Sequence, residues 1–170
     1  MDLKSSIRTV EDWPKKGISF KDITTLLKDG KLLKEATEQM AAPFKSDKVD
    51  LVVGPESRGF IFGVPVAVAL GAGFVPVRKK GKLPAKTVSA TYELEYGTDT
   101  LEMHEDAIKK GQRVLIVDDL LATGGTITAV AEMCERLGAK IVGFSFMIEL
   151  EFLNGKEKLK GRKINSVVKY

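Results

Sequence analysis

Two adjacent acids followed by a glycine-rich loop are the residues of this chain best suited to chemistry. Asp118 and Asp119 come directly after the apolar run at residues 114–117, and a short loop and a helical pattern follow them. Ligands collect at the carboxyl ends of buried parallel strands. Adjacent glycines allow a tight backbone whose N–H groups converge on one bound group, and threonine hydroxyls with a helix N-terminus would complete a phosphate cradle. The residues of this loop are Ala122, Thr123, Gly124, Gly125 and Thr126.

The paired acids narrow the choice of ligand. Carboxylates beside a phosphate cradle repel a second phosphate but accept hydrogen bonds from hydroxyls, so the pattern predicts a phosphorylated sugar with free vicinal hydroxyls. A Walker loop is excluded because no lysine follows Gly125, and the G-x-G-x-x-G spacing of a dinucleotide loop is missing here. For an isolated TGGT string, an ordinary strand-to-helix turn would be an equal alternative. The whole DDLLATGGT string after an apolar strand favours the phosphate site.

A second loop and a basic run add positive charge to this prediction. Residues 51–59 repeat the order of apolar strand, glycine-containing loop and helix. This loop carries Arg58, whose five N–H donors suit a diphosphate better than a monophosphate. A surface arginine on a tight turn is the alternative. The basic run holds four cations within five residues, of which we interpret Lys80 as solvated surface: Arg78, Lys79, Lys80 and Lys82.

Six strings of the sequence resemble the type I phosphoribosyltransferase family: RTVEDWP, GISFKDI, ESRGF, RKKGKLP, LEYG and VLIVDDLLATGGT. They cover most of the chain in the family's order and rough spacing. The resemblance implies purine salvage, in which the 5-phosphoribosyl group of phosphoribosyl pyrophosphate passes to adenine and gives AMP and pyrophosphate. Two alternatives stay open: another purine base such as xanthine or hypoxanthine, and a non-catalytic regulator that binds phosphoribosyl pyrophosphate and acts on nucleic acid.

The resemblance also implies roles for the two loops and the basic run. Residues 122–126 would anchor the 5′-phosphate. Asp118 and Asp119 would hold the ribose hydroxyls and stabilise the positive charge of an oxocarbenium-like transition state. The residues that match the family's pyrophosphate site are Glu56, Ser57, Arg58, Arg78, Lys79 and Lys82.

The purine end of the site depends on the resemblance. Glu93 and Glu95 share one face of a predicted strand, and their spacing does not choose between them. The family's catalytic glutamate occupies the position of Glu95 in the LEYG string, where it would handle or orient a proton at the purine ring. An N-terminal hood would cover the base, with Phe20 stacked on it and the backbone groups of Ser19 and Lys21 reading its edge.

Composition fits small anionic substrates better than nucleic acid. The net charge is +4 over 170 residues, but the positive residues are scattered among 23 acids, which argues against a broad nucleic-acid face. No cluster of potential metal ligands surrounds His104, the single histidine, so no protein-built metal site is expected. Magnesium would arrive with phosphoribosyl pyrophosphate, held mostly by substrate oxygens and waters.

The expected setting is the cytoplasm. The single cysteine, Cys134, lies on the apolar stripe of a predicted helix and cannot form an internal disulfide, which fits a reducing compartment. The N-terminal residues lack the apolar core of a signal peptide, and no apolar stretch reaches the roughly 18 residues that cross a membrane. The family implies a homodimer, with Arg78 acting across the subunit interface.

Alternating apolar runs and helical stripes must position these residues. Core strands are expected at residues 49–53, 74–77, 114–117 and 141–148, with a short one at 164–168. Helices are expected from Lys31, after Gly59, and from Ile127 to Leu137 before Gly138. This alternation predicts an α/β domain with a central parallel sheet flanked by helices, the type I phosphoribosyltransferase fold.

The expected domain spans residues 1–170, with two additions over the site. The hood, at about residues 1–28, is expected as a helical start, a turn at residues 14–17 and an extended segment. A flexible β-hairpin is expected within residues 78–106, because residues 88–94 alternate in polarity and apolar positions return beyond Gly97. Such a hairpin could close over a bound substrate.

Overall fold

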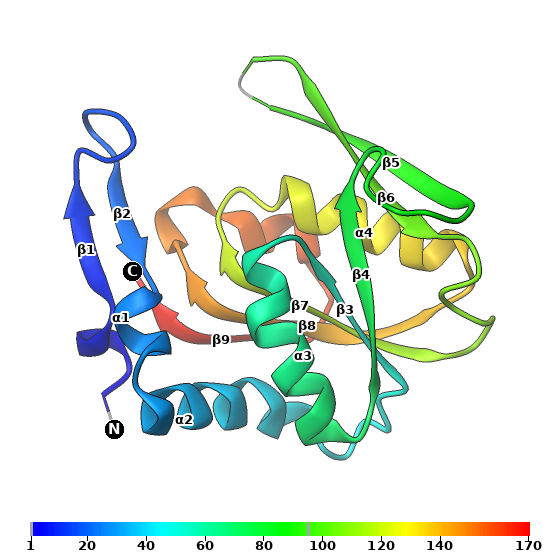
Figure 1. Cartoon of the computed structure of the whole chain (residues 1–170), viewed down its shortest axis with the longest axis horizontal. Coiled ribbons are helices and arrows are strands. Elements are labelled where there is room, and N and C mark those ends of the chain that lie inside the picture. The colour runs from blue at the N-terminus through cyan, green and yellow to red at the C-terminus, as the bar shows by residue number, and fades with distance from the viewer. Residues whose placement is uncertain (1, 95) are drawn as a thin grey trace.

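A mixed seven-stranded sheet forms the centre of the computed structural model, which describes residues 2–94 and 96–170 (Figure 1). The strand order is β5-β6-β4-β3-β7-β8-β9, and the five strands from β4 to β9 in this order are parallel. The hairpin strands β5 and β6 join antiparallel beside β4. The bounds are β3 (Leu51–Pro55), β4 (Gly73–Lys79), β5 (Thr87–Glu93), β6 (Thr98–His104), β7 (Arg113–Leu121), β8 (Lys140–Glu149) and β9 (Ile164–Lys169).

Helices cover both faces of the sheet, which confirms the expected α/β class. Alternate residues of β7 face opposite sides because side chains along a strand alternate. Leu115 and Val117 pack into the core under α2 and α3, while Val114 and Ile116 pack into the core under α4. The helical elements are η1 (Lys4–Ser6), α1 (Thr24–Leu27), α2 (Gly30–Ala41), η2 (Ala42–Phe44), α3 (Arg58–Leu70), α4 (Gly125–Arg136), η3 (Glu151–Leu153) and η4 (Gly155–Leu159).

The N-terminal segment forms a two-stranded antiparallel ribbon at one end of the molecule (Figure 1). Its strands are β1 (Arg8–Glu11) and β2 (Ser19–Asp22), paired with Val10 opposite Phe20. The predicted turn and extended segment are present, but β1 was not predicted. Its four residues are mostly exposed and pair only with β2, so they carry no apolar alternation that a sequence could reveal.

Two core strands run further than the apolar residues predicted. β7 continues through Asp118 and Asp119 to Leu121, because its backbone stays paired with β8 as far as Glu149. The acids therefore lie on the end of the strand and not in the loop after it. β4 likewise continues through its basic end to Lys79, where it pairs with β6. In both strands, backbone pairing with a neighbour extends the element past the change in polarity.

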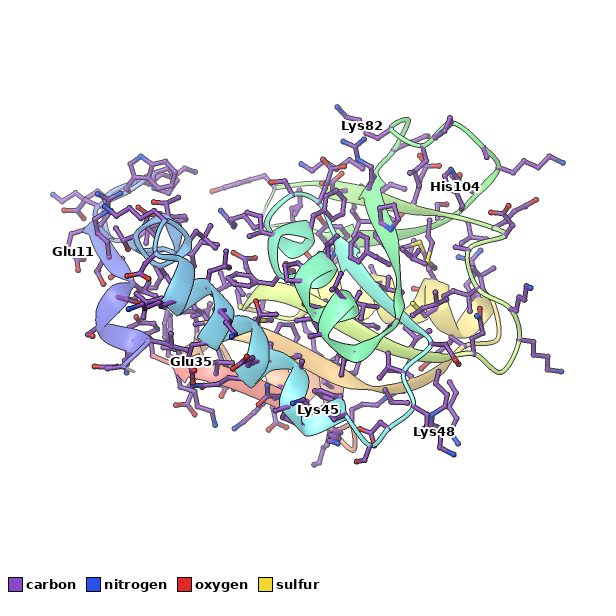
Figure 2. All side chains as sticks on the ribbon, turned by 60° about the horizontal axis from the view of Figure 1, so that its bottom comes forward. Glu11, Glu35, Lys45, Lys48, Lys82 and His104 are labelled. Carbon is purple, nitrogen blue, oxygen red and sulfur yellow. The ribbon has the colours of Figure 1, made fainter. Side chains whose placement is uncertain are left out.

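Within the described residues, the structure has no helix that is long and apolar enough to cross a membrane. Charged side chains point outward around the whole molecule in the view of Figure 2. In that view, Glu11 marks the hood, and Lys82 and His104 mark the side of the hairpin. The hood and the hairpin stand at opposite ends of the sheet (Figure 1). The carboxyl ends of β3, β7 and β8 lie between them.

Candidate active site

Three hollows meet where the parallel strands end. β3, β7 and β8 run in the same direction, so the segments that follow Pro55, Leu121 and Glu149 emerge at one edge of the sheet. The loop after β3 leads into α3, and the loop after β7 leads into α4. Arg58 and Asp119 line all three hollows.

An ion pair stands at this junction. The Arg58 Nε lies 2.8 Å from Asp119 Oδ2, and the Asp119 side chain is only 10% exposed. The guanidinium carbon of Arg58 also lies 5.7 Å from the centre of the Phe20 ring, within the range of a cation–π contact. Arg58 thus connects the acids of β7 to the hood.

The first hollow, of about 190 Å³, is lined by the predicted phosphate loop, residues 122–126, together with both acids. Gly124 has a φ of +89° and precedes the first turn of α4, a backbone conformation that suits glycine. The N-terminus of α4 therefore faces this loop, and its unpaired N–H groups favour an anion. The structure thus brings the five loop residues together at one hollow, and their role in binding a phosphate stays a prediction.

A segment that the sequence did not single out supports this loop from behind. A Cβ atom on Gly155 would lie 2.2 Å from the Ala122 carbonyl oxygen, and one on Gly124 would lie 2.9 Å from the Gly155 carbonyl oxygen. The two backbones are therefore in direct contact, and only glycine fits at Gly155. Lys156 reaches back to the buried Glu149 carboxylate, with Nζ and Oε1 separated by 3.9 Å. η4 thus acts as a wall behind the phosphate loop.

The second hollow, of about 420 Å³, contains most of the residues predicted to bind pyrophosphate. The Glu56–Ser57 peptide bond at its edge is cis. The Glu56 carboxylate accepts a hydrogen bond from the Lys79 backbone N–H at 2.8 Å and pairs with Arg78 Nε at 3.3 Å, so it joins the loop after β3 to the end of β4. The predicted residues that line the hollow are Glu56, Ser57, Arg58, Lys79, Asp118, Asp119 and Thr126.

Two predicted pyrophosphate ligands do not line any of these hollows. Arg78 turns toward Glu56, and Lys82 lies exposed in the turn after β4, on the hairpin side of the molecule (Figure 2). The Lys82 backbone N–H donates to the Lys79 carbonyl at 3.2 Å, which closes that turn. Both side chains are partly or fully accessible to solvent, and their roles stay predictions.

The third hollow, of about 140 Å³, lies under the hood and is mainly apolar. Phe20 forms one wall, and the edge of Trp13 packs on it with ring centres 4.6 Å apart. The side chain of Lys21 leaves this hollow, because its Nζ lies 4.2 Å from the centre of the Tyr170 ring. The other lining residues are Ile18, Ser19, Lys21, Arg58, Asp119, Leu120, Ile148 and Leu150.

Asp118 has an unusual electrostatic environment. Burial, followed by the negative charge of Asp119, raises the pKa of Asp118 well above its usual range, while the positive charge of Arg58 opposes this shift. The Asp119 backbone N–H donates to Asp118 Oδ1 at 2.8 Å. A Cβ on Gly59 would come within 3.0 Å of the same oxygen, so the glycine allows the first turn of α3 to approach the carboxylate. A perturbed carboxylate in a cleft is typical of a functional site.

Glu95, the predicted catalytic glutamate, lies outside the described residues. Glu93, the alternative on the same predicted strand face, is exposed at the end of β5 and pairs with Thr98 across the hairpin. Its role stays open.

Several residues that line the hollows were not predicted. Tyr92 and Leu101 reach the second hollow from the hairpin, and Ile148 and Leu150 reach the third from the end of β8. The end of β8 could have been inferred, because ligands meet the carboxyl ends of neighbouring parallel strands. The position of Tyr92 could not have been inferred, because the alternation of apolar and polar residues along a hairpin does not show which face of the hairpin meets a distant loop.

Two further predictions concern single residues. Burial raises the pKa of the Cys134 thiol to about 12, in agreement with a packing role for this residue. Among residues 2–94 and 96–170, no group of three or more histidine, cysteine or carboxylate side chains is arranged to hold a metal ion. The half-buried His104 accepts a hydrogen bond at its Nε2 from the Ala85 N–H, at 3.3 Å.

The sequence of this chain matches a known protein family and several known relatives. The family described as "Phosphoribosyl transferase domain" matches residues 22–167. An adenine phosphoribosyltransferase of Clostridium perfringens is 62% identical over 170 residues, which covers 100% of this chain and 99% of the relative. The adenine phosphoribosyltransferase of Clostridium botulinum strain Loch Maree is 58% identical over 170 residues, with the same coverage of both chains.

Solved structures agree with the sequence comparison. The adenine phosphoribosyltransferase of Thermoanaerobacter pseudethanolicus superposes with a TM-score of 0.96 at 56% identity, covering 99% of this chain and 98% of that one. The enzyme of Saccharomyces cerevisiae superposes with a TM-score of 0.92 at 40% identity, covering 98% and 96%. The yeast structure is a complex with D-2,5-dideoxy-2,5-imino-altritol 1,6-bisphosphate and adenine.

Proposed function

The chain belongs to the phosphoribosyl transferase family, and we infer that it transfers the 5-phosphoribosyl group from phosphoribosyl pyrophosphate to adenine. The products are AMP and pyrophosphate, so the reaction is a step of purine salvage. Identity of 58% and 62% to adenine phosphoribosyltransferases over the full chain supports this activity. When the protein is supplied with the two substrates and magnesium, AMP and pyrophosphate should form in equal amounts.

One observation carries the assignment of the site: the three hollows meet at the Arg58–Asp119 pair. A phosphoribosyl pyrophosphate molecule has two phosphate-bearing ends joined by a ribose, and adenine must reach the anomeric carbon between them. We assign the first hollow to the 5′-phosphate, the second to pyrophosphate and the third to adenine. The junction is then the place of the ribose.

The acids of β7 have a clear task in this arrangement. The purine nitrogen forms a bond to the anomeric carbon while the bond to the pyrophosphate oxygen breaks, and positive charge develops on the ribose. The carboxylates of Asp118 and Asp119, at the end of β7, would accept hydrogen bonds from the ribose hydroxyls and stabilise that charge. Arg58 and Lys79 would neutralise the charge of the leaving pyrophosphate.

Adenine would enter under the hood. Phe20 and the apolar walls of the third hollow suit an aromatic ring, and the backbone of Ser19 and Lys21 offers polar groups for its edge. The turned-away side chain of Lys21 supports a backbone role at that position. For Glu95 we propose the handling of a proton on the purine ring, on the strength of its place in the LEYG string.

Magnesium fits this site as a companion of the substrate. The carboxylates of Glu56, Asp118 and Asp119 line the second hollow and offer the oxygen atoms that magnesium prefers, but Glu56 and Asp119 are already engaged by cationic or N–H partners. A metal bound mostly through pyrophosphate oxygens and waters is therefore more suitable than a protein cage. When bound, it supplies positive charge at the leaving group.

We propose that two copies of the chain associate through α3. After Arg58, residues 59–70 of this helix carry no charged side chain, yet Ile61, Val64 and Val68 are 38%, 44% and 75% exposed. These three residues share one helix face, and an exposed apolar stripe of this kind typically marks an interaction surface. Since α3 begins at Arg58, a second copy would lie beside the pyrophosphate loop, which supports a role for Arg78 across the interface.

A cytoplasmic setting also remains our proposal. Cys134 is the single cysteine of the sequence and is a buried free thiol, which suits a reducing compartment. Adenine and phosphoribosyl pyrophosphate are the expected small-molecule partners of the protein.

A further inference from the structure

A chain of polar contacts connects the phosphate loop to the basic end of β4 through the hairpin. Tyr92 on β5 lies directly opposite Asp99 on β6, and the Tyr92 hydroxyl donates to Asp99 Oδ2 at 3.3 Å. Lys79 Nζ approaches the same oxygen at 3.7 Å. The Tyr92 side chain also borders Thr126, and both residues line the second hollow. Because a hydroxyl has one proton to donate and Asp99 receives that proton, the Tyr92 oxygen can serve Thr126 only as an acceptor.

The two ends of this chain are residues that we assign to opposite ends of the same substrate. Thr126 belongs to the loop assigned to the 5′-phosphate, and Lys79 lines the hollow assigned to pyrophosphate. Tyr92 lines the hollow assigned to pyrophosphate but has no assigned role there, and Asp99 lines neither hollow. Their position between Thr126 and Lys79 is therefore a feature that the reaction as described above does not explain.

The surroundings hold Tyr92 in place. Its ring lies over the start of α4, with a ring carbon 3.8 Å from where a Cβ on Gly125 would be. At the other end of α4, the Arg136 guanidinium donates to the Ser89 carbonyl oxygen of β5. The strand is thus attached to α4 at both ends. The second carboxylate oxygen of Asp99 accepts the Thr100 N–H at 2.9 Å, which fixes the orientation of that side chain.

The protonation state of Tyr92 agrees with this arrangement. Burial raises the pKa of Tyr92, and the negative charge of Asp99 also contributes to the rise, while the neighbouring Thr126 side chain opposes it. The hydroxyl therefore remains protonated at neutral pH and remains able to donate to the carboxylate.

We propose that Tyr92 is a positioning residue that orients the Thr126 hydroxyl and, through Asp99, the Lys79 ammonium, so that both ends of phosphoribosyl pyrophosphate meet fixed partners. The proposal rests on the proposed function. Without the Tyr92 hydroxyl, the Thr126 hydroxyl is free to rotate at the 5′-phosphate. Asp99 Oδ2 then has Lys79 as its remaining side-chain partner, so the carboxylate competes more strongly with pyrophosphate for the lysine.

Replacement of Tyr92 by phenylalanine tests this directly, because it keeps the ring over Gly125 and removes only the hydroxyl. The matched control is Thr91→Val, which removes a hydroxyl from the neighbouring exposed cross-strand pair, where Thr91 and Thr100 oxygens are 3.2 Å apart. Calorimetric titrations would measure the Kd of ribose 5-phosphate and of magnesium pyrophosphate separately. Steady-state kinetics would measure kcat and the KM of adenine.

For Tyr92→Phe we expect both dissociation constants to rise by about fivefold, the size of one hydrogen bond, with little change in kcat or in the KM of adenine. Thr91→Val should change neither constant. Retention of wild-type affinity for either ligand by Tyr92→Phe would overturn the proposal, and so would an equal loss in Thr91→Val. If the wild-type protein formed AMP and only the Tyr92 result failed, the positioning role alone would be wrong. If it formed no AMP, the proposed function would fail as well.

Discussion

Arg58 and Asp119 form an ion pair, with Nε and Oδ2 2.8 Å apart, at the one point shared by three hollows. The pair joins the start of α3 to the end of β7, and the guanidinium carbon of Arg58 lies 5.7 Å from the centre of the Phe20 ring. Arg58 therefore has two tasks in our account. It contacts the leaving pyrophosphate, and it holds Asp119 in position beside the ribose.

Replacement of Arg58 by alanine should weaken the binding of phosphoribosyl pyrophosphate more than the binding of AMP. The arginine contributes charge-assisted hydrogen bonds to a diphosphate that AMP lacks, so the KM of phosphoribosyl pyrophosphate should rise by about tenfold or more. Titration with AMP gives the comparison, since AMP occupies the phosphate and base ends. Equal losses for the two ligands would contradict a role at the diphosphate.

Asp118→Asn should lower kcat by about tenfold or more, because the carboxylate stabilises charge that exists only in the transition state. The kcat of the wild-type protein should also fall as the pH is lowered. This fall should begin at a higher pH than the ionisation of an ordinary aspartate would give. Burial and the charge of Asp119 raise the pKa of Asp118, so its charge is lost early as the pH falls. A pH profile of kcat for both proteins is the measurement. Unchanged kinetics in the variant would remove Asp118 from the mechanism.

The same substitution should raise thermal stability at neutral pH. A carboxyl whose pKa is higher in the folded state binds more protons there than in the unfolded state, so its ionisation destabilises the fold as the pH rises through that raised pKa. The neutral amide of Asp118→Asn removes this cost. The difference in Tm between variant and wild type should shrink as the pH is lowered toward the unfolded pKa. A lower Tm for the variant than for the wild type at neutral pH would contradict a raised pKa of Asp118 in the folded protein.

Glu95→Gln should reduce kcat with a modest change in the KM of adenine, because a proton-handling residue acts in the chemical step. Glu93→Gln is the matched control two residues earlier in the sequence. A decrease in kcat confined to Glu93→Gln would move the catalytic role to that residue.

Val68→Asp should prevent self-association, because it places a charge at the most exposed residue of the apolar stripe of α3. Sedimentation velocity would compare the variant with wild type at equal concentration. The matched control is Phe152→Asp, since Phe152 is similarly exposed, at 72%, but lies in η3. A wild-type protein that sediments as a monomer would contradict the proposed interface.

The sequence alone predicted the core of this fold because its strands are buried. The runs before Pro55 and before Asp118 are apolar without interruption, as expected of strands covered on both faces. The stripe from Ile127 to Cys134 predicted α4 for the same reason. The two acids and the glycine loop could then be placed at a strand end, and this placement located the first hollow.

Contacts between distant segments could not be predicted in this way. The wall behind the phosphate loop depends on Gly155. Only glycine fits at this position because the Ala122 carbonyl lies against it, and the sequence does not show that contact. The link from Tyr92 to Thr126 depends on how the hairpin crosses α4, and no local pattern encodes that crossing. β1 was missed because its residues are exposed and pair with one strand only.

The most direct test of the central claim is product formation from phosphoribosyl pyrophosphate and magnesium with each of four purine bases: adenine, hypoxanthine, guanine and xanthine. A hollow built to pair with one purine edge leaves polar groups unpaired with another, so kcat/KM for adenine should exceed the others by about a hundredfold or more. AMP should appear together with an equal amount of pyrophosphate. Equal or faster reaction with another base, or no base-dependent release of pyrophosphate, would contradict the account.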